Sequence, residues 1–555
     1  MCTSVPPGRP IGPRGDRVPT GHNVTEARRR AAGRPLRARR PSRGRRSYRS
    51  FANSRPIPID FPIPCGVSAV YRHPLQPAPL GLRRSACHST MRFSLALFAV
   101  CGFASVLSSV LSGQPQPGAR PTSSAELQSL LDARVRVGSN PGIVAALITP
   151  SGRIAAVAGT AKSADGKPLS ATTVFEIGSI TKIVTGTLFA EAVRRGEVQE
   201  SDKLAAHLPE FAYPAKGELI TLLDLATHRS GLPSFPIGYT PPDPLDPWAT
   251  VDSAALAKGF ASGPLRFAPG EKAEYSNVGA GLLGRVLVRR AQMPDYEALV
   301  RSRFVQPLGL RDFSVSLSPG QRARKAIGHT AGKTPTSDWQ IPYLAGAGAI
   351  NSTLDDMTRL AAACLDTVTG PLAAAIRDAQ RPRRVLRGPV RIGLHWITYP
   401  RPDSSSILWH NGGTGGFRTW LGCNQRTGVA AVVMTNSDQG VDDIGLHLVD
   451  PGIPLSAPQP KGVRIAVAVD SAIVEQFVGQ FRLAPAMTFS FSREGSRLFV
   501  TPTDQPRYEV FAESPAKWFL RAVDATIEFE RDEAGKVTAL WYQQEGPRQR
   551  AVRVR

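Results

Sequence analysis

The chain has 555 residues, of which 42% are hydrophobic and 7% aromatic, and its formal net charge is +24. This composition excludes a wholly disordered chain, a collagen and a coiled coil, and the length can hold about two or three domains. A positive excess of this size ordinarily indicates nucleic acid or an anionic membrane surface as a partner.

Residues 1–90 form an Arg- and Pro-rich segment without a helical or strand period. They contain 18 Arg, no Lys and three acidic residues, and therefore carry +15 of the total charge. Such a segment cannot bury enough apolar surface to offset its chain entropy, so we expect it to be disordered. It is either a basic arm for nucleic acid or membrane, or an upstream extension from a start codon assigned too early. The next segment favours the second interpretation.

Residues 91–112 have the three parts of a secretory signal peptide. Arg92 precedes an apolar run that extends to Leu111, and small residues follow at Ser112 and Gly113. Cleavage after either small residue would leave a secreted or periplasmic protein without a stable membrane anchor. A buried helix or a transmembrane anchor is the alternative, because the run approaches the length that spans a bilayer.

The remaining chain divides into two predicted domains with a linker before each. Residues 113–124 are a Pro-rich linker, and residues 125–450 alternate between helical and strand patterns. A second linker covers residues 451–471. Short alternating strands follow in residues 472–555, which we predict to be a separate β-rich domain.

Several elements are predicted individually from their patterns. A helix begins near Ala125, and strands at residues 142–148 and 154–159 are joined by a turn. In the C-terminal domain, strands are predicted at residues 487–491, 497–500 and 526–530.

Two of the six cysteines, Cys364 and Cys423, remain after export. Two cysteines cannot form a disulfide framework, and neither Cys-x-x-Cys nor His-Glu-x-x-His occurs, so neither redox chemistry nor a zinc site has a sequence basis. We expect buried thiols, with a single bridge between them left open. No metal ion and no cofactor are expected.

The first chemical motif is Ser179-x-x-Lys182, within residues 175–190. An apolar stretch, a Gly turn and a helical run place Ser179 at the start of a helix, where free N–H groups and the helix dipole favour negative charge. Lys182 falls on the same helical face. A serine hydroxyl needs a neighbouring base, and Ser with Lys is a known pairing. The pattern alone is weak, because Ser514-x-x-Lys517 has the same spacing among predicted strands.

Two further motifs give the pattern its specificity. Tyr275 is the only one of ten tyrosines with an Asn two residues later, at Asn277. The Gly-rich segment 410–417 lies beside the apolar strand predicted at residues 429–434, and its glycines would let a substrate lie against the backbone. Residues 227–232, Thr-His-Arg-Ser-Gly-Leu, stand between the first two motifs. Each element alone is more often a turn than a site, but their order indicates an active site.

Over residues 125–450 the chain resembles the penicillin-recognising serine hydrolases, and within them the class C β-lactamase-like group, which includes DD-peptidases, D-aminopeptidases and esterases. The resemblance rests on Ser179-x-x-Lys182, Tyr275-x-Asn277, His410-x-Gly412 and residues 227–232. It implies an α+β fold in which an antiparallel sheet is flanked by helices and joined by an all-helical region, with the site between them. The C-terminal part resembles the small β-barrel-like modules appended to many of these hydrolases.

The resemblance also implies a role for each matching residue. Ser179 would be the nucleophile that forms an acyl-enzyme, Lys182 would polarise it, and Tyr275 would be the general base. A free tyrosine titrates near pH 10, so a phenolate at neutral pH requires nearby cations such as Lys182. Tyr275 acts either as a phenolate or in concert with Lys182. Asn277 would orient Lys182 and contact a substrate amide, and the N–H groups of Ser179 and Gly413 would form the oxyanion hole.

The third motif departs from the Lys-Thr-Gly of class C lactamases. His410 stands in place of the Lys and Asn411 in place of the Thr, a pattern that resembles relatives with His-Thr-Gly. His410, Gly412 and Gly413 are the implied substrate-binding residues at this motif. In the family the Lys and Thr help hold a substrate carboxylate, so the resemblance does not extend to efficient β-lactam hydrolysis. The implied substrates are β-lactams, D-amino-acid peptides or esters; a non-hydrolytic penicillin-binding sensor and a simple esterase are the alternatives.

Rival interpretations are weaker. Gly279-x-Gly281-x-x-Gly284 matches a dinucleotide fingerprint, but no strand precedes it, so we expect a helix that packs closely through its glycines. No Gly-x-Ser-x-Gly occurs, which argues against an α/β-hydrolase. His228 and His395 are expected to be structural, because the chemistry already has a base. The expected partner is a small-molecule or peptide substrate and no nucleic acid, since most of the excess charge precedes the signal peptide.

Overall fold

The computed structural model describes residues 118–162, 166–330, 334–458, 464–484, 487–503, 505, 507–520, 525–544 and 548–554. The predictions for residues 1–112, and for residues 113–117 of the linker at 113–124, lie outside the described residues. Within the described ranges, no helix is both long enough and apolar enough to cross a lipid bilayer.

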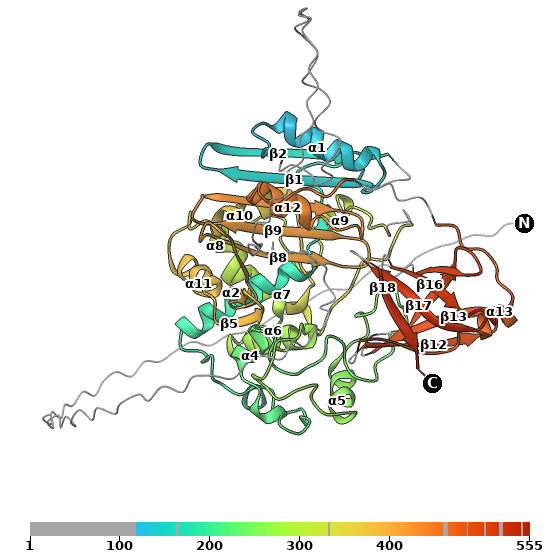
Figure 1. Ribbon diagram of the computed structural model, residues 1–555. Helices are drawn as coiled ribbons and strands as arrows, with labels where there is room; N and C mark the ends of the chain where they lie inside the picture. Colours follow the sequence, from blue (N-terminus) through green and yellow to red (C-terminus); the bar gives the residue numbers. More distant parts are fainter. Residues whose placement is uncertain are drawn as a thin grey trace, which may run out of the picture. The chain divides into compact units, whose positions relative to one another are not determined.

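The central element is an eight-stranded antiparallel sheet with the strand order β2-β1-β10-β9-β8-β7-β6-β5 (Figure 1). Its strands are β1 (Gly142–Thr149), β2 (Gly152–Gly159), β5 (Arg384–Arg387), β6 (Val390–Ile392), β7 (Ile397–Pro400), β8 (Ser406–Gly413), β9 (Arg418–Asn424) and β10 (Val429–Thr435). The predicted hairpin at residues 142–159 is therefore confirmed. The Gly-rich segment is not the direct neighbour of the apolar strand β10, however, because β9 pairs with both β8 and β10.

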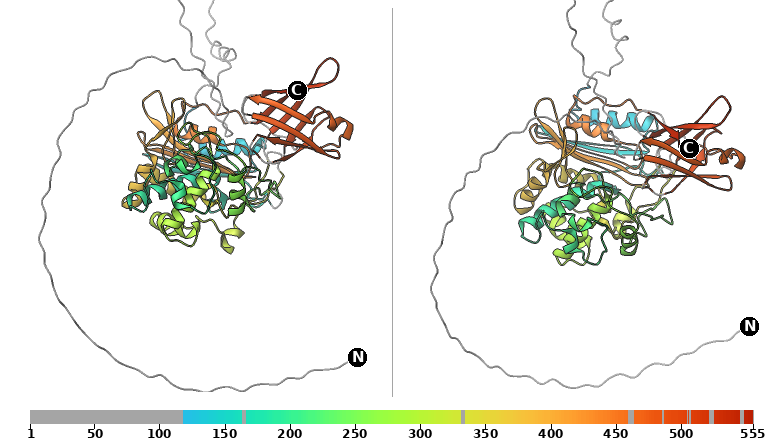
Figure 2. Two further views of the ribbon diagram at one scale, coloured as in Figure 1. Left: turned by 90° about the horizontal axis from the view of Figure 1, so that it is seen from below. Right: turned by 60° about the horizontal axis from the view of Figure 1, so that its bottom comes forward.

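A hydrophobic core lies on each face of the sheet. Side chains on a strand alternate between the two faces, so neighbouring residues of one strand pack in different cores. In β1, Ile143 and Ala145 pack in one core and Val144 and Ala146 in the other. Helices α1 (Ser124–Arg136) and α12 (Asp442–Val449) supply the first core, and α2 (Thr181–Arg194), α10 (Leu354–Cys364) and α11 (Pro371–Gln380) supply the second. Figure 2 (right) shows α1 and the green helices on opposite sides of the sheet.

A helical region follows α2 in the chain. Its elements are α3 (Leu204–His207), α4 (Leu222–Ala226), α5 (Ser253–Ala261), α6 (Asn277–Arg290), α7 (Tyr296–Val300), α8 (Gln306–Leu308) and α9 (Pro319–Ala323). A separate two-stranded sheet pairs β3 (Phe175–Glu176), which precedes α2, with β4 (Asn351–Ser352), which precedes α10. The expectation of an antiparallel sheet with flanking helices and a helical region is confirmed. In α6, a Cβ on Gly281 would lie 2.5 Å from Leu344, so its glycines serve close packing, as predicted.

The C-terminal residues form a closed eight-stranded barrel, which confirms the predicted β-rich module. Its elements are α13 (Ser471–Glu475), β11 (Gly479–Ala484), β12 (Met487–Glu494), β13 (Arg497–Pro502), β14 (Tyr508–Ala512), β15 (Lys517–Leu520), β16 (Ala525–Arg531), β17 (Val537–Gln544) and β18 (Gln549–Arg553). Pairing of β11 with β18 closes the barrel. Phe491 packs against Phe481 and Phe529 in its core, with ring centroids 5.5 and 5.3 Å apart.

Cys364 and Cys423 are buried free thiols, as expected. Burial raises the pKa of Cys364 well above its ordinary value, and that of Cys423 to about 12. Neither thiol is therefore a nucleophile near neutral pH, because the thiolate is the reactive form.

Candidate active site

Ser179 lies in a 3-10 turn, Gly178–Ile180, immediately before α2. Gly178 enters this turn with φ +52°, in the left-handed region that residues with a Cβ adopt only under strain. Lys182 follows one turn later and is fully buried. Its Nζ lies 2.9 Å from Oγ of Ser179. Local helical spacing therefore brings the two side chains into hydrogen-bond contact.

Two further acceptors hold the ammonium group of Lys182. Nζ donates to Oδ1 of Asn277 at 2.7 Å and to the carbonyl oxygen of Ala347 at 2.6 Å, so together with Ser179 three acceptors match its three N–H bonds. Asn277 in turn donates through Nδ2 to Oγ of Ser234 at 2.9 Å. The sequence did not identify Ala347, because any residue type supplies a backbone carbonyl. Ser234 lies two positions after the 227–232 motif, and this closeness was the only feature of the sequence that could have indicated its role.

Tyr275 is presented at the N-terminus of α6. Oγ of Ser276 caps this helix by accepting from the N–H of Gly279 at 2.8 Å, which fixes the backbone on the C-terminal side of Tyr275. Oη of Tyr275 donates to Oγ of Ser179 at 2.7 Å, and Nζ of Lys182 lies 4.8 Å from the centroid of the Tyr275 ring. Ser179 therefore contacts both groups that were predicted to activate it.

The end of β8 packs directly against the turn that carries Ser179. A Cβ on Gly412 would lie 1.9 Å from the carbonyl oxygen of Ile177, and one on Gly178 would lie 2.6 Å from the amide nitrogen of Gly413. Thr419 of β9 also donates from Oγ1 to the Ile177 carbonyl at 2.9 Å. Glycine is required at these positions because backbone meets backbone, which places the Gly413 amide beside the nucleophile turn.

His410 and Asn411 lie on opposite faces of β8. The His410 ring is buried with its centroid 6.3 Å from that of Tyr275. Burial and the charge of Lys182 lower the pKa of His410 to about 4, so this histidine is neutral near pH 7. Asn411 instead donates to Oδ2 of Asp442 on α12 at 2.7 Å. The two residues that replace the family's Lys and Thr thus supply neither a cation nor a hydroxyl to the site.

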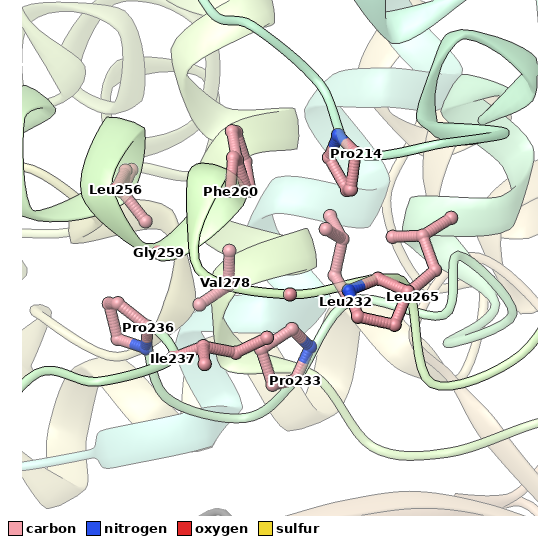
Figure 3. Close-up of a pocket in the computed structure, with 12 residues that line it drawn as sticks. Pro214, Leu232, Pro233, Pro236, Ile237, Leu256, Gly259, Phe260, Leu265 and Val278 are labelled. Carbon is pink, nitrogen blue, oxygen red and sulfur yellow. The ribbon is translucent and has the colours of Figure 1, made fainter.

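A small apolar pocket adjoins the Asn277 side of the site (Figure 3). Leu232, Pro233 and Ile237 line it together with Val278 and Phe260. About 10 Å³ is left for the centre of a water-sized group, which is room for about one such group. The pocket is too small to define a class of substrate.

The comparisons with known proteins agree with this geometry. A family model described as Beta-lactamase matches residues 127–449. The chain belongs to the β-lactamase family. It is a serine hydrolase of the class C-like group. A second family model, described only as a domain of unknown function (DUF3471), matches the barrel at residues 463–551.

Two curated relatives and one solved structure illustrate the range of this β-lactamase family. "Penicillin-binding protein 4*" of Bacillus subtilis is 25% identical over 72% of this chain and 91% of its own length. "D-alanyl-D-alanine-carboxypeptidase/endopeptidase AmpH" of Escherichia coli is 27% identical over 50% of this chain and 76% of its own length. A class C β-lactamase mutant has the same fold, with a TM-score of 0.50 and 19% identity over 57% of this chain and 93% of its own.

Across the part of the chain that the structure describes, no group of three or more His, Cys, Asp or Glu side chains is placed to hold a metal ion. The second Ser-x-x-Lys sequence, Ser514-x-x-Lys517, forms a turn that leads into β15. In this turn the backbone amide of Lys517 donates to Oγ of Ser514 at 3.2 Å. Its side chains do not reproduce the contact between Lys182 and Ser179.

Proposed function

We propose that the protein hydrolyses amide or ester bonds of small molecules or peptides through an acyl-enzyme on Ser179. The observation that carries this proposal is the convergence of Oη of Tyr275 and Nζ of Lys182 on Oγ of Ser179, at 2.7 and 2.9 Å. A base within hydrogen-bond reach of a serine is what activates this weak nucleophile.

In the acylation step, Oγ of Ser179 attacks the substrate carbonyl carbon while its proton passes to the pair formed by Tyr275 and Lys182. The carbonyl electron pair moves onto oxygen, which the amides of Ser179 and Gly413 stabilise. The carbon–nitrogen or carbon–oxygen bond then breaks, and the leaving group takes the proton. In deacylation a water molecule attacks the acyl carbon and gives a proton to Tyr275. The bond between the acyl carbon and Oγ of Ser179 then breaks, Oγ takes the proton from Tyr275, and the carboxylic acid is released.

The proposed substrates are esters, D-amino-acid peptides and β-lactams, and those without a carboxylate at this position are placed first. A substrate carboxylate is held best by a cation, and the residues in place of the family's Lys and Thr are a neutral His410 and an Asn411 that bonds to Asp442. Slow hydrolysis of a penicilloyl-enzyme would make the protein a penicillin-binding sensor, which is the second candidate. The names of the relatives, a penicillin-binding protein and a carboxypeptidase, support both candidates.

A labelling experiment and a substrate panel test the proposal. A fluorescent penicillin or a fluorophosphonate is expected to label the protein covalently, and Ser179→Ala is expected to abolish the label. Unchanged labelling of the variant would refute the assignment of the nucleophile. Hydrolysis of p-nitrophenyl esters and D-Ala-D-Ala peptides, compared with nitrocefin, then ranks the substrates. Labelling without turnover of any of them supports the sensor.

We further propose that the protein is exported with residues 91–112 as its signal, that it retains no membrane anchor, and that nucleic acid is not a partner. The sequence pattern of that segment supports this proposal.

A further inference from the structure

His228 contacts Tyr275 and both of its chain neighbours. Its ring packs on the Tyr275 ring, with centroids 4.5 Å apart and a tilt of 36°. Its Nδ1 accepts a hydrogen bond from the amide of Ser276 at 3.3 Å, and its carbonyl oxygen accepts from the amide of Glu274 at 2.8 Å. The backbone N–H groups of the residues before and after Tyr275 are therefore both bound to the same histidine.

The backbone at His228 is in a conformation that most residues avoid. Its φ is +56°, and that of His395, whose ring centroid lies 5.0 Å away, is +63°. Residues other than glycine in the left-handed region are uncommon, and such strain collects at functional sites. The amide of His395 donates to the carbonyl of Ala226 at 2.9 Å, which ties the second strained residue to the end of α4, two residues before the first.

Burial keeps His228 neutral. His228 and His395 are both at most 2% exposed. Burial, and next the charge of Lys182, lowers the pKa of His228 well below its ordinary value. Burial, and next the neighbouring His228, does the same to the pKa of His395. The groups facing His228 are Lys182, Tyr275, His395 and His410. In the neutral ring, Nδ1 accepts from Ser276, so the proton resides on Nε2.

We propose that His228 is a positioning residue that fixes Tyr275 against Ser179 through Nδ1, which accepts a hydrogen bond from the Ser276 amide. As a role in catalysis, this inference rests on the hydrolase function proposed above. His395 provides a natural comparison, because it shares the burial and the positive φ of His228, and its ring packs on that of His228.

The test uses a matched pair of substitutions at each histidine. Asn and Gly both tolerate positive φ, but only Asn offers a side-chain oxygen in place of Nδ1. We compare His228→Asn with His228→Gly, and His395→Asn with His395→Gly, in the full-length protein. The first readout is hydrogen exchange at the peptide that contains the Ser276 amide, which needs no catalytic activity. The second is the rate at which a fluorophosphonate labels Ser179.

His228→Gly is expected to raise exchange at Ser276 and to slow labelling by about tenfold or more, because small displacements of a catalytic group are costly. His228→Asn is expected to keep both values within about threefold of wild type, although it loses the same ring. The two His395 variants are expected to match each other in both readouts, whatever stability they lose.

The outcomes separate the inference from the function on which it rests. Equal exchange in His228→Asn and His228→Gly would overturn the positioning role, as would an Asn-to-Gly difference at His395 as large as that at His228. Failure of the wild-type protein to react with the fluorophosphonate would instead count against the proposed function. The exchange comparison would then still decide whether His228 fixes the Tyr275 segment.

Discussion

Oη of Tyr275 lies 2.7 Å from Oγ of Ser179, although 96 residues separate the two in the chain. Ser179 lies in the turn before α2, and Tyr275 lies two residues before the start of α6. The contact therefore depends on how the N-termini of these two helices pack together. The proton that must leave Ser179 has an oxygen within hydrogen-bond reach, which is the first requirement for a general base.

Tyr275→Phe is expected to slow acylation by about 10² to 10⁴, because it removes this oxygen and leaves the ring. Thermal stability should change little, since the ring still packs on His228. Release of p-nitrophenol from an ester substrate measures the first effect and a melting curve the second. Tyr213→Phe is the control, because its hydroxyl bonds to the carbonyl of Leu208 away from Ser179. Wild-type acylation by Tyr275→Phe would contradict the assignment.

Gly178→Ala is expected to damage catalysis more than stability. The new Cβ would lie 2.6 Å from the amide nitrogen of Gly413, so β8 must shift and the N–H group of Gly413 moves with it. Loss of one oxyanion-hole donor lowers the rate by about 10²- to 10³-fold. Gly196→Ala is the matched control, because Gly196 has φ +72° but nothing within 4 Å of its Cβ. Both variants should lose about 1 kcal/mol of stability from the left-handed backbone. Equal rates in the two variants would argue against the predicted oxyanion hole.

Acid is expected to destabilise the hydrolase domain through His410. Its folded-state pKa of about 4 lies below the ordinary value near 6.5, so the folded state favours the neutral ring. The stabilising contribution is present above about pH 6.5 and is lost as pH falls towards 4, by on the order of 3 kcal/mol. Melting curves of wild type and His410→Gln across this range measure it. Parallel pH dependence in the two proteins would contradict this prediction.

Glu176→Gln is expected to destabilise the fold by about 3 kcal/mol, because it removes one partner of a buried ion pair. Glu176 is 4% exposed and Lys325 8% exposed, with 2.7 Å between Oε1 and Nζ. Burial raises the pKa of the Glu176 carboxyl, and Lys325 opposes this shift.

Thermal and urea unfolding measure this loss. The double variant Glu176→Leu, Lys325→Met should be more stable than Glu176→Gln, because it also removes the buried charge of Lys325. Asp338 then loses its contact with Lys325 at 2.5 Å, but its side chain is 40% exposed and can be hydrated. A double variant less stable than Glu176→Gln would show that the pair itself stabilises the fold.

The exported protein is expected to begin near Gln114. Expression of the whole 555-residue chain in a bacterial host, followed by N-terminal sequencing of the periplasmic or secreted fraction, measures this. The segment 91–112 has the charge and apolar length that signal peptidases recognise. A mature chain that retains the Arg-rich residues before Met91 would contradict the prediction.

The sequence by itself determined those features that depend on neighbours in the chain. Helical spacing of three residues puts Lys182 over Ser179. Two apolar runs joined by a turn predict β1 and β2, and apolar alternation predicts the barrel strands β12, β13 and β16. The glycines of α6 could be assigned to packing because no strand precedes them. The departure at His410 and Asn411 was also visible, since it concerns residue type alone.

Only the tertiary structure decided what depends on distant segments. It placed the carbonyl of Ala347 on Lys182 and turned Asn411 towards Asp442. It inserted β9 between β8 and β10, which period-2 alternation cannot show because alternation gives the buried face and not the partner. It also brought His228 onto Tyr275, a histidine for which the sequence predicted a structural role. A backbone carbonyl, a strand partner and a ring contact are set by packing across the chain, and residue type alone does not encode them.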